Sequence, residues 1–312
     1  MEILFYRKRF NRRFSIYDQF RMGEIGQELP EETELIFSDE PELLETADVV
    51  ILDVPFLIGD VAAGRIPKYE GQVWVGWCME CEENYPWLKH PAVKETFDIW
   101  MTYRQNADIV LPYYDVSFLS KLMKPPHPKQ ADVCMLISST VNQSRRLEYL
   151  LELMKWIPID SYGRWQNNCT LPDDKGYLSK LEVIRKYRFT IAFENAVGED
   201  YVTEKFYEPL LAGSVPVYWG APNIDQLAPA KSAFVDVRSY PEPRLLAEQL
   251  RKWCQDEKAY MRFFDWKKHP MESSFVRKLE WQRTHPLLRL VNMLKEKRMP
   301  TPSSSPNTRF RT

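Results

Sequence analysis

The stretch that decides the fold is residues 189–220, which read FTIAFENAVGEDYVTEKFYEPLLAGSVPVYWG. Residues 190–193 are apolar or β-branched, which is typical of a buried strand. Thr203 can cap the helix that follows, and Gly213 can end it. Residues 215–219 then return as a second strand. This strand–helix–strand order predicts a parallel α/β sheet.

The start of that helix is a predicted anion site. The N–H groups of its first turn have no partner within the helix and carry partial positive charge, and Lys205 stands beside them. A diphosphate would be stabilised at such a terminus. A second interpretation needs no ligand: Glu204 favours the helix N-terminus, and Lys205 is a solvated surface charge.

The segments FEN, EDYVTEK and LLAGSVPVYWG together resemble the donor-binding signature of the α-1,3/1,4-fucosyltransferases, glycosyltransferase family 10. The resemblance implies an inverting enzyme that transfers L-fucose from GDP-fucose. It also implies an α/β protein of the GT-B type, with two Rossmann-like domains facing across a cleft. Glu204 is expected on the fucose hydroxyls and Lys205 on the diphosphate. The donor-binding residues implied by the resemblance are Glu194, Asn195, Tyr201, Glu204 and Lys205.

A further phosphate ligand is predicted at Arg145. Residues 137–139 end a strand pattern, and Arg145 follows near the start of a helix, where a guanidinium suits a phosphate. The resemblance agrees, because the family has a phosphate-binding arginine at the same spacing before a tyrosine, as Arg145 stands before Tyr149. Arg146 is the alternative register, and an exposed arginine pair is the alternative without a ligand. The face of this helix expected to be apolar comprises Leu147, Leu150, Leu151 and Met154.

The candidate general base is Glu80. Residues 73–81 read VWVGWCMEC, an aromatic strand that ends at an acidic residue. The stretch resembles the fucosyltransferase strand that leads to Glu-Ser-Pro, which implies that Glu80 is the base. Glu82 and Glu83 are the alternative carboxylates, and a solvated strand-end acid is the alternative without catalysis. Trp74 and Trp77 are expected to wall off the carboxylate from water and raise its pKa.

The implied chemistry is a single displacement. An acceptor hydroxyl loses its proton to a carboxylate base while GDP leaves from the opposite face of the sugar. Lys205, Arg145 and two helix N-termini can stabilise the leaving diphosphate without a metal, so we expect no required cofactor. Mn²⁺ or Mg²⁺ would act through the diphosphate. The five cysteines and four histidines do not cluster, which disfavours a metal or thiol centre and fits reduced thiols in a cytosol.

Composition excludes other classes of protein. The chain has 312 residues, 44% of them hydrophobic, and a net charge of −2, so it can form about two domains and shows no electrostatic footprint for nucleic acid. The apolar run within its first residues, MEILFYRKRFNRRF, is too short for a signal peptide or membrane anchor. The chain therefore resembles the soluble bacterial members of the family, cytoplasmic or peripheral to the inner membrane through the basic run at residues 7–13.

A proline-rich linker at residues 124–129 divides the chain. We expect an acceptor-binding α/β domain at 1–124, a GDP-fucose-binding Rossmann-like domain with C-terminal helices at 125–298, and a disordered tail at 299–312. The resemblance implies a GlcNAc-containing, N-acetyllactosamine-type acceptor, fucosylated at the 3- or 4-position to give a Lewis-type product. Two alternatives stay open: a GT-B transferase for another nucleotide sugar, and a non-catalytic nucleotide- or glycan-binding protein.

The remaining elements follow from periodicity. Strands are expected at residues 49–54, 73–78, 108–111, 133–138 and 233–237, and helices at 91–100, 116–123, 145–156, 177–186, 204–211 and 244–256.

Overall fold

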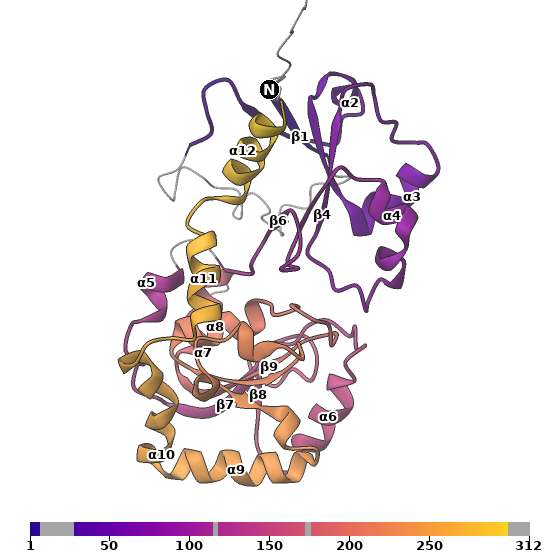
Figure 1. The fold of residues 1–312 in the computed structure, drawn as a ribbon. Helices are drawn as coiled ribbons and strands as arrows, with labels where there is room; N and C mark the ends of the chain where they lie inside the picture. Colours follow the sequence, from indigo (N-terminus) through magenta and orange to yellow (C-terminus); the bar gives the residue numbers. More distant parts are fainter. Residues whose placement is uncertain (7–27, 115–117, 172–175, 299–312) are drawn as a thin grey trace, which may run out of the picture.

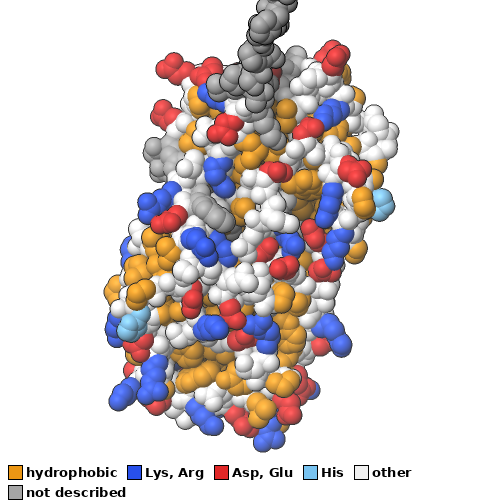
Figure 2. All heavy atoms as spheres, in the orientation of Figure 1, with side chains coloured by type: hydrophobic (Ala, Val, Ile, Leu, Met, Phe, Trp, Pro, Cys, Tyr) orange, Lys and Arg blue, Asp and Glu red, His pale blue; other side chains and the backbone are white. Residues whose placement is uncertain are grey.

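The computed structural model describes residues 1–6, 28–114, 118–171 and 176–298. Within these ranges the chain forms two parallel sheets, each with its own helices, and the two domains lie one above the other in Figure 1. Acidic and basic side chains are interspersed over the face seen in Figure 2, as the small net charge leads one to expect. The basic run at residues 7–13 and the tail at 299–312 lie outside the described residues.

The first sheet has the strand order β2-β1-β3-β4-β5-β6, and all its pairs are parallel. Its strands are β1 (Glu2–Tyr6), β2 (Glu34–Ser38), β3 (Val49–Asp53), β4 (Val73–Cys78), β5 (Ile99–Thr102) and β6 (Ile109–Val110). Its helices are α2 (Leu43–Thr46), α3 (Val54–Ala62) and α4 (Pro91–Glu95). Helix α5 (Phe118–Leu122) precedes the linker in sequence, but its buried Phe118 and Leu122 pack in one cluster with Phe206 of the second domain. Strands β1 and β2 were not predicted from sequence.

The second sheet has the strand order β11-β10-β9-β7-β8, again with parallel pairs. Its strands are β7 (Ala131–Met135), β8 (Asp160–Ser161), β9 (Tyr187–Phe193), β10 (Val215–Trp219) and β11 (Val235–Asp236). Its helices are α6 (Arg146–Leu153), α7 (Tyr177–Ile184), α8 (Glu204–Ala212), α9 (Pro243–Gln255) and α10 (Glu257–Met261). The order reverses between β7 and β9, the point at which such sheets bind ligands outside their carboxyl ends.

The tryptophans of β4 belong to the core of the first domain. Trp74 and Trp77 are 3% and 7% exposed and lie in two different apolar clusters, because alternate residues of a strand face opposite sides of the sheet. Phe5 meets Trp77 edge to face, with ring centroids 5.6 Å apart. Both rings are thus packed in the core, because helices or loops cover both faces of a parallel sheet. That these tryptophans wall off Glu80 stays a prediction.

Two predicted helices differ from the structure. The helix expected at residues 91–100 ends at Glu95, because residues 99–102 pair with β4 as strand β5. In α6 the buried residues are Arg146, Tyr149, Leu150 and Leu153, whereas Leu151 is 47% exposed. Of the residues expected on the apolar face, Leu150 is buried and Leu147 and Met154 pack partly buried against the same core, so only Leu151 was placed wrongly.

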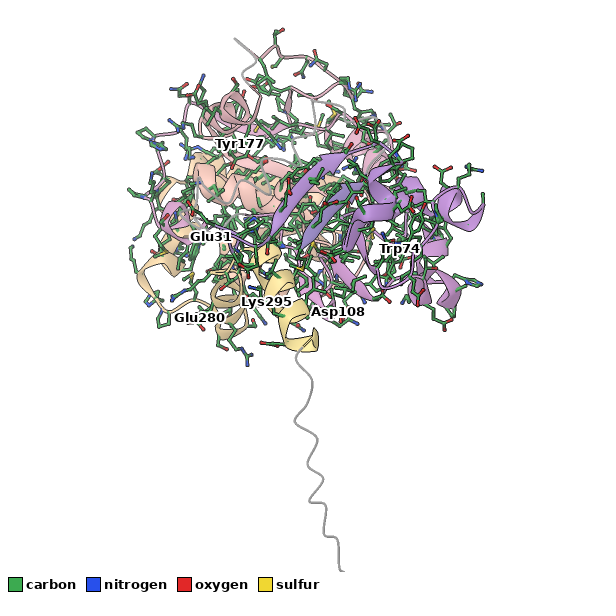
Figure 3. All side chains as sticks on the ribbon, turned by 90° about the horizontal axis from the view of Figure 1, so that it is seen from above. Glu31, Trp74, Asp108, Tyr177, Glu280 and Lys295 are labelled. Atoms are coloured by element: carbon green, nitrogen blue, oxygen red, sulfur yellow. The ribbon has the colours of Figure 1, made fainter. Side chains whose placement is uncertain are left out.

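The last two helices bring the chain back to the first domain. These are α11 (Ser273–Trp281) and α12 (Pro286–Arg298). Leu287, Leu290 and Val291 of α12 are fully buried in the same cluster as Ile3 and Val49 of the first sheet. Seen from above in Figure 3, α12, which carries the labelled Lys295, lies beside those strands. A helix that the sequence grouped with residues 125–298 thus helps to complete the core of the first domain.

Candidate active site

The start of α8 is built as the sequence predicts. The helix begins at Glu204, and the hydroxyl of Thr203 accepts a hydrogen bond from the backbone N–H of Lys205, 3.3 Å away. At the other end Gly213 adopts a left-handed conformation with φ of 70°, which costs glycine little. The Lys205 ammonium therefore lies at the N-terminus of this helix, the end at which the helix dipole is positive.

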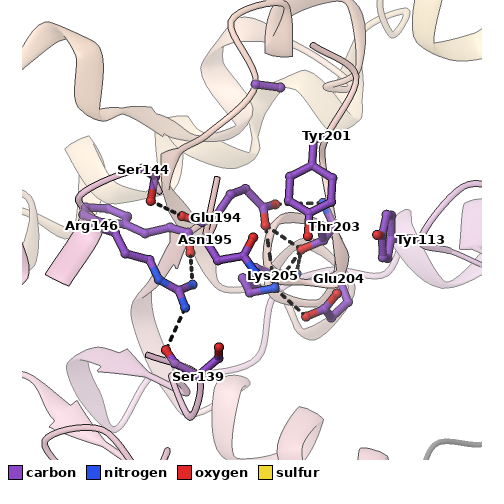
Figure 4. A network of polar contacts seen from close by, with 12 residues as sticks. Tyr113, Ser139, Ser144, Arg146, Glu194, Asn195, Tyr201, Thr203, Glu204 and Lys205 are labelled. Atoms are coloured by element: carbon purple, nitrogen blue, oxygen red, sulfur yellow. Dashed lines mark hydrogen bonds and ion pairs between the residues drawn. The ribbon is translucent and has the colours of Figure 1, made fainter. Parts of the chain in front are cut away.

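Lys205 stands among acceptors at this end of α8, as Figure 4 shows. Its Nζ lies 2.9 Å from Glu204 Oε1, 3.1 Å from Thr203 Oγ1 and 3.6 Å from Glu194 Oε2. Burial opposes the charge, yet Glu204 and Glu194 raise the pKa of Lys205 to about 12. Burial likewise opposes the charge of Glu204, but Lys205 and Lys180 hold its pKa at about 2. Both groups are therefore charged at neutral pH.

Glu194 ends β9 and is fully buried. One carboxylate oxygen accepts the backbone N–H of Thr203 at 2.8 Å, and the other accepts the Thr203 hydroxyl at 2.7 Å. Burial raises the pKa of Glu194 to about 7, although Lys205 opposes the shift. The side chain faces the protein interior rather than an open cleft.

The two arginines of α6 have different environments. Arg146 is 1% exposed and donates to the carbonyl oxygens of Phe193 at 2.8 Å and Ser139 at 3.0 Å. Phe193 is the last residue of β9 and Ser139 lies beyond the end of β7, so Arg146 joins the two strand ends at the reversal point. The Arg145 side chain is 81% exposed, with Nε 3.9 Å from Glu148 Oε1. Arg146 is engaged by the backbone, whereas the Arg145 side chain is open to solvent.

Glu80 follows β4 in the first domain and is partly buried. Burial raises the pKa of its carboxyl; Lys205 lowers that pKa, and Glu204 raises it. These influences come from α8, so the structure brings the charges of the two domains together. The hydroxyl of Tyr113 donates to the carbonyl oxygen of Met79 and holds the segment next to Glu80. Of the two alternative carboxylates, Glu83 forms an ion pair with Lys89 instead.

The loop between β9 and α8 also contacts the first domain. Asn84 donates from Nδ2 to Asn195 Oδ1 at 3.2 Å. A Cβ atom built on Gly198 would lie 2.6 Å from Cys81 Sγ, so this backbone approaches the Glu80 segment more closely than another residue would allow. The β9–α8 loop of the second domain therefore contacts the Glu80 segment of the first domain directly.

Asp200 anchors the same loop from a second direction. It is 8% exposed and has a left-handed backbone with φ of 64°. Its carboxylate accepts from the backbone N–H of Gln105 at 3.1 Å, from the Gln105 side chain and from Asn223 Nδ2 at 2.8 Å. Arg104 adds a bond from Nη1 to the carbonyl oxygen of Glu199, 2.8 Å away. These contacts fix the loop to residues 104–105 of the first domain.

Tyr201 packs at the junction between the domains. Its side chain is 3% exposed and meets Tyr103 and Tyr113 of the first domain edge to face, with ring centroids 5.1 and 6.1 Å away. We did not predict Tyr103, Tyr113 or Gln105 as contact residues from the sequence. The burial of Arg146 was not predicted either. Each belongs to a contact between distant segments, which periodicity does not reveal.

The described residues give little evidence for a metal centre, a reactive thiol or a membrane-spanning helix. Within the described ranges, His, Cys, Asp and Glu nowhere gather in a group of three that could hold a metal ion. The five cysteines are free thiols, and burial raises the pKa of Cys78 to about 12, which disfavours a reactive thiolate. In the part of the chain that the structure describes, no helix is long and apolar enough to cross a membrane.

Two parallel α/β domains that meet at a junction are the architecture of the GT-B fold. Solved structures agree on the fold. A crystal structure of an α-1,3-fucosyltransferase aligns with a TM-score of 0.67 at 17% identity, covering 95% of this chain and 90% of that one. A crystal structure of an α-1,3-fucosyltransferase with GDP-fucose gives a TM-score of 0.65 at 16% identity, covering 96% and 91%. The predicted GT-B fold is confirmed.

The chain belongs to glycosyltransferase family 10, the fucosyltransferases, as its sequence resemblance indicated. Residues 126–305 match "Glycosyltransferase family 10 (fucosyltransferase) C-term", and residues 1–114 match "Fucosyltransferase, N-terminal". The second match covers the region where the sequence expected the acceptor domain.

Two relatives of this chain carry names that state different fucosyltransferase activities. The chain is 41% identical over 221 residues to GDP-fucose protein O-fucosyltransferase 3 of Xenopus tropicalis, covering 65% of this chain and 47% of that protein. It is 32% identical over 216 residues to α-(1,3)-fucosyltransferase B of Drosophila melanogaster, covering 62% and 48%. The chain thus spans about half the length of these relatives. Both are animal proteins, so they lend no support to the expected bacterial type.

Proposed function

We propose that this protein transfers L-fucose from GDP-fucose to an acceptor hydroxyl, with inversion at the anomeric carbon. One observation carries the proposal: the segment of the first domain that bears Glu80 contacts the loop leading to Lys205 at the start of α8, through Asn84 with Asn195 and through the close approach of Gly198 to Cys81. Base and leaving-group cation are thereby supplied from opposite domains, as a displacement across a cleft requires. Family membership supports the choice of fucose.

In the proposed step the acceptor oxygen forms a bond to the anomeric carbon as its proton moves to Glu80. The bond from that carbon to the diphosphate oxygen breaks, and GDP leaves with the electron pair. A raised pKa suits Glu80 to the base role, since a more basic carboxylate takes a proton more readily. The growing charge on GDP is met by Lys205, by the exposed Arg145 and by the first-turn N–H groups of α8.

The acceptor that we propose is a GlcNAc unit in an N-acetyllactosamine-type glycan, fucosylated at the 3- or 4-position. The relative named α-(1,3)-fucosyltransferase B supports this choice. A hydroxyl on a protein is the second candidate, favoured by the relative named GDP-fucose protein O-fucosyltransferase 3, which is 41% identical.

One set of incubations tests donor and acceptor together. Purified protein is given GDP-fucose, GDP-mannose or a UDP-sugar, with Galβ1-4GlcNAc, Galβ1-3GlcNAc or a folded protein substrate, and products are read by mass spectrometry. We expect product with GDP-fucose alone and with one acceptor class. Turnover with another nucleotide sugar instead would refute the proposed donor. Binding of GDP-fucose without product from any acceptor would favour the non-catalytic alternative.

The proposed reaction requires no metal, because protein cations already face the leaving group. Initial rates with EDTA should therefore equal those of untreated protein, and Mn²⁺ or Mg²⁺ should raise them modestly through the diphosphate. Complete loss of activity with EDTA, restored by a divalent ion, would show that a metal is needed.

A further inference from the structure

Building on the proposed donor site, we propose that Glu194 is a positioning residue. Its carboxylate holds Thr203 and the Lys205 ammonium in the place where the diphosphate binds, and Glu194 itself does not touch the donor. This role differs from the direct donor contact that the sequence resemblance implies.

Burial and hydrogen bonding leave Glu194 little capacity for a ligand. The side chain is 0% exposed, and each carboxylate oxygen accepts one bond from Thr203, at 2.8 and 2.7 Å. The second oxygen also lies 3.6 Å from Lys205 Nζ. A donor could reach these oxygens only by displacing the start of α8. The contacts of Glu194 are therefore with the groups that would bind the donor.

The backbone around Glu194 fixes the direction of its side chain. The Glu194 N–H donates to the carbonyl oxygen of Trp219 at 2.8 Å, which extends the pairing of β9 with β10. The Glu194 carbonyl oxygen accepts the Ser144 hydroxyl at 2.6 Å. A Cβ atom on Gly220 would stand 2.5 Å from Glu194 Cγ, so a glycine is needed to make room for this carboxylate. Such enclosure gives the carboxylate one orientation.

Thr203 transmits that orientation to the helix. Its hydroxyl donates to Glu194 and accepts from the Lys205 backbone N–H at 3.3 Å and from Lys205 Nζ at 3.1 Å. The Lys205 ammonium thus has acceptors on its protein side, while its side chain stays 26% exposed towards a ligand. Because a lysine loses substantial side-chain entropy when it is immobilised, holding it in advance favours binding of the diphosphate.

The charge of Glu194 is sensitive to pH because of where it lies. Burial raises the pKa of Glu194 to about 7, with Lys205 opposing the shift and Glu204 adding to it. The titratable or charged groups around it come from α6, α8, β10, the β9–α8 loop and the first domain: Arg146, Lys205, Glu204, Tyr207, Tyr218, Tyr201 and Tyr113. Protonation of Glu194 would remove the negative charge beside Lys205 and weaken the contacts that hold the Lys205 ammonium in place.

The test is the affinity for GDP, measured by calorimetry on the whole chain. Glu194→Gln keeps the shape of the side chain and removes its charge, and we expect about tenfold weaker binding or more at neutral pH. Thr203→Val removes the transmitting hydroxyl and should weaken binding in the same direction. Thr203→Ser keeps the hydroxyl and should stay within about twofold of wild type. Glu208→Gln is the matched control, because Glu208 is a buried acid of α8 that pairs with Lys180 instead.

A pH series separates positioning from a loss of structure. The ratio of wild-type to Glu194→Gln affinity cancels the titration of GDP itself, and we expect that ratio to fall as the pH is lowered from about 8 to about 6. A purely structural role would leave the ratio flat. If Glu194→Gln fails to fold, the GDP affinities of Thr203→Val and Thr203→Ser are compared instead. These substitutions change the core less.

Several results would overturn the role. Glu194→Gln binding GDP as tightly as wild type, a flat affinity ratio, or equal affinities for the two Thr203 variants would each remove Glu194 from the positioning of Lys205 while leaving the proposed donor site intact. Wild-type protein that does not bind GDP would refute the proposed function itself, and this role with it.

Discussion

The two charged segments that meet between the domains are held in different ways. In the second domain, Glu194, Thr203 and Lys205 bond to one another, and the Lys205 ammonium has three acceptors within 3.6 Å. In the first domain, the Glu80 carboxylate has no hydrogen bond or ion pair among the described residues, although the Glu80 carbonyl oxygen accepts from Cys78 Sγ at 3.5 Å. Burial raises the pKa of that carboxyl. A leaving-group cation benefits from a fixed position, whereas a base must stay accessible to exchange its proton.

This contrast is tested most strongly at Glu80. Glu80→Gln should lower kcat by about 10²–10⁴-fold, since it removes a general base, and should leave GDP affinity nearly unchanged. Steady-state kinetics and calorimetry on the same preparation measure both quantities. Glu83→Gln is the control, because Glu83 pairs with Lys89. Unchanged turnover in Glu80→Gln would remove Glu80 from the mechanism.

The neighbouring arginines give the next largest effect. Arg146→Ala should lower the free energy of unfolding by about 3 kcal/mol or more, because it leaves buried partners unpaired. Arg145→Ala should change that free energy by less than about 0.5 kcal/mol, since its side chain is exposed. Arg145→Ala should instead weaken GDP binding about tenfold. Denaturant titration and calorimetry distinguish the two. Equal stability of both variants would show that the difference in burial has no energetic consequence.

Lys205→Ala tests the segment of the second domain that is held by its own hydrogen bonds. Loss of a charged partner for the diphosphate should weaken GDP affinity by about 10- to 100-fold. Lys258→Ala, at an exposed position on α10, is the control and should bind GDP as wild type does. A Lys205→Ala protein with wild-type affinity would mean that the diphosphate lies elsewhere.

The buried acid predicts a pH dependence of stability. The pKa of Glu194 is raised from 4.5 to about 7, so the folded state binds more protons than the unfolded state between these values. Its contribution is complete below pH 4.5 and is lost as the pH rises through 7. Wild type should therefore lose about 2 kcal/mol relative to Glu194→Gln across this window. The lowered pKa of Glu204, about 2, acts below the window. Parallel stability curves for the two proteins would contradict the expected shift.

The smallest effect is expected at the junction itself. Asp200→Ala leaves the Gln105 N–H and Asn223 without their acceptor, which should lower the free energy of unfolding by about 1–2 kcal/mol. It should also lower kcat more than it weakens GDP affinity, because the β9–α8 loop would lose one of its links to the Glu80 domain. Asp225→Ala, an acid in a nearby surface turn, is the control. A change in GDP affinity alone would place Asp200 in donor binding rather than in domain contact.

Local sequence was informative where one short segment contains all the interacting parts. The start of α8 at Glu204, its Thr203 cap, its Gly213 end and strand β10 were all predicted, because caps and strand periodicity involve neighbouring residues. The resemblance in the same segment gave the family. Strands β1 and β2, by contrast, were not predicted, although each contains a run of apolar residues.

The sequence by itself therefore determined the fold class, the family and the chemical groups available for a displacement. Tertiary structure decided which of those groups lie inside and which face a ligand. Arg145 and Arg146 are adjacent and chemically identical, and only the packing of α6 against two strand ends separates them. Glu80 and Lys205 are far apart along the chain, and their electrostatic coupling exists only because the domains meet. Burial and long-range charge depend on distances in space, which residue order does not specify.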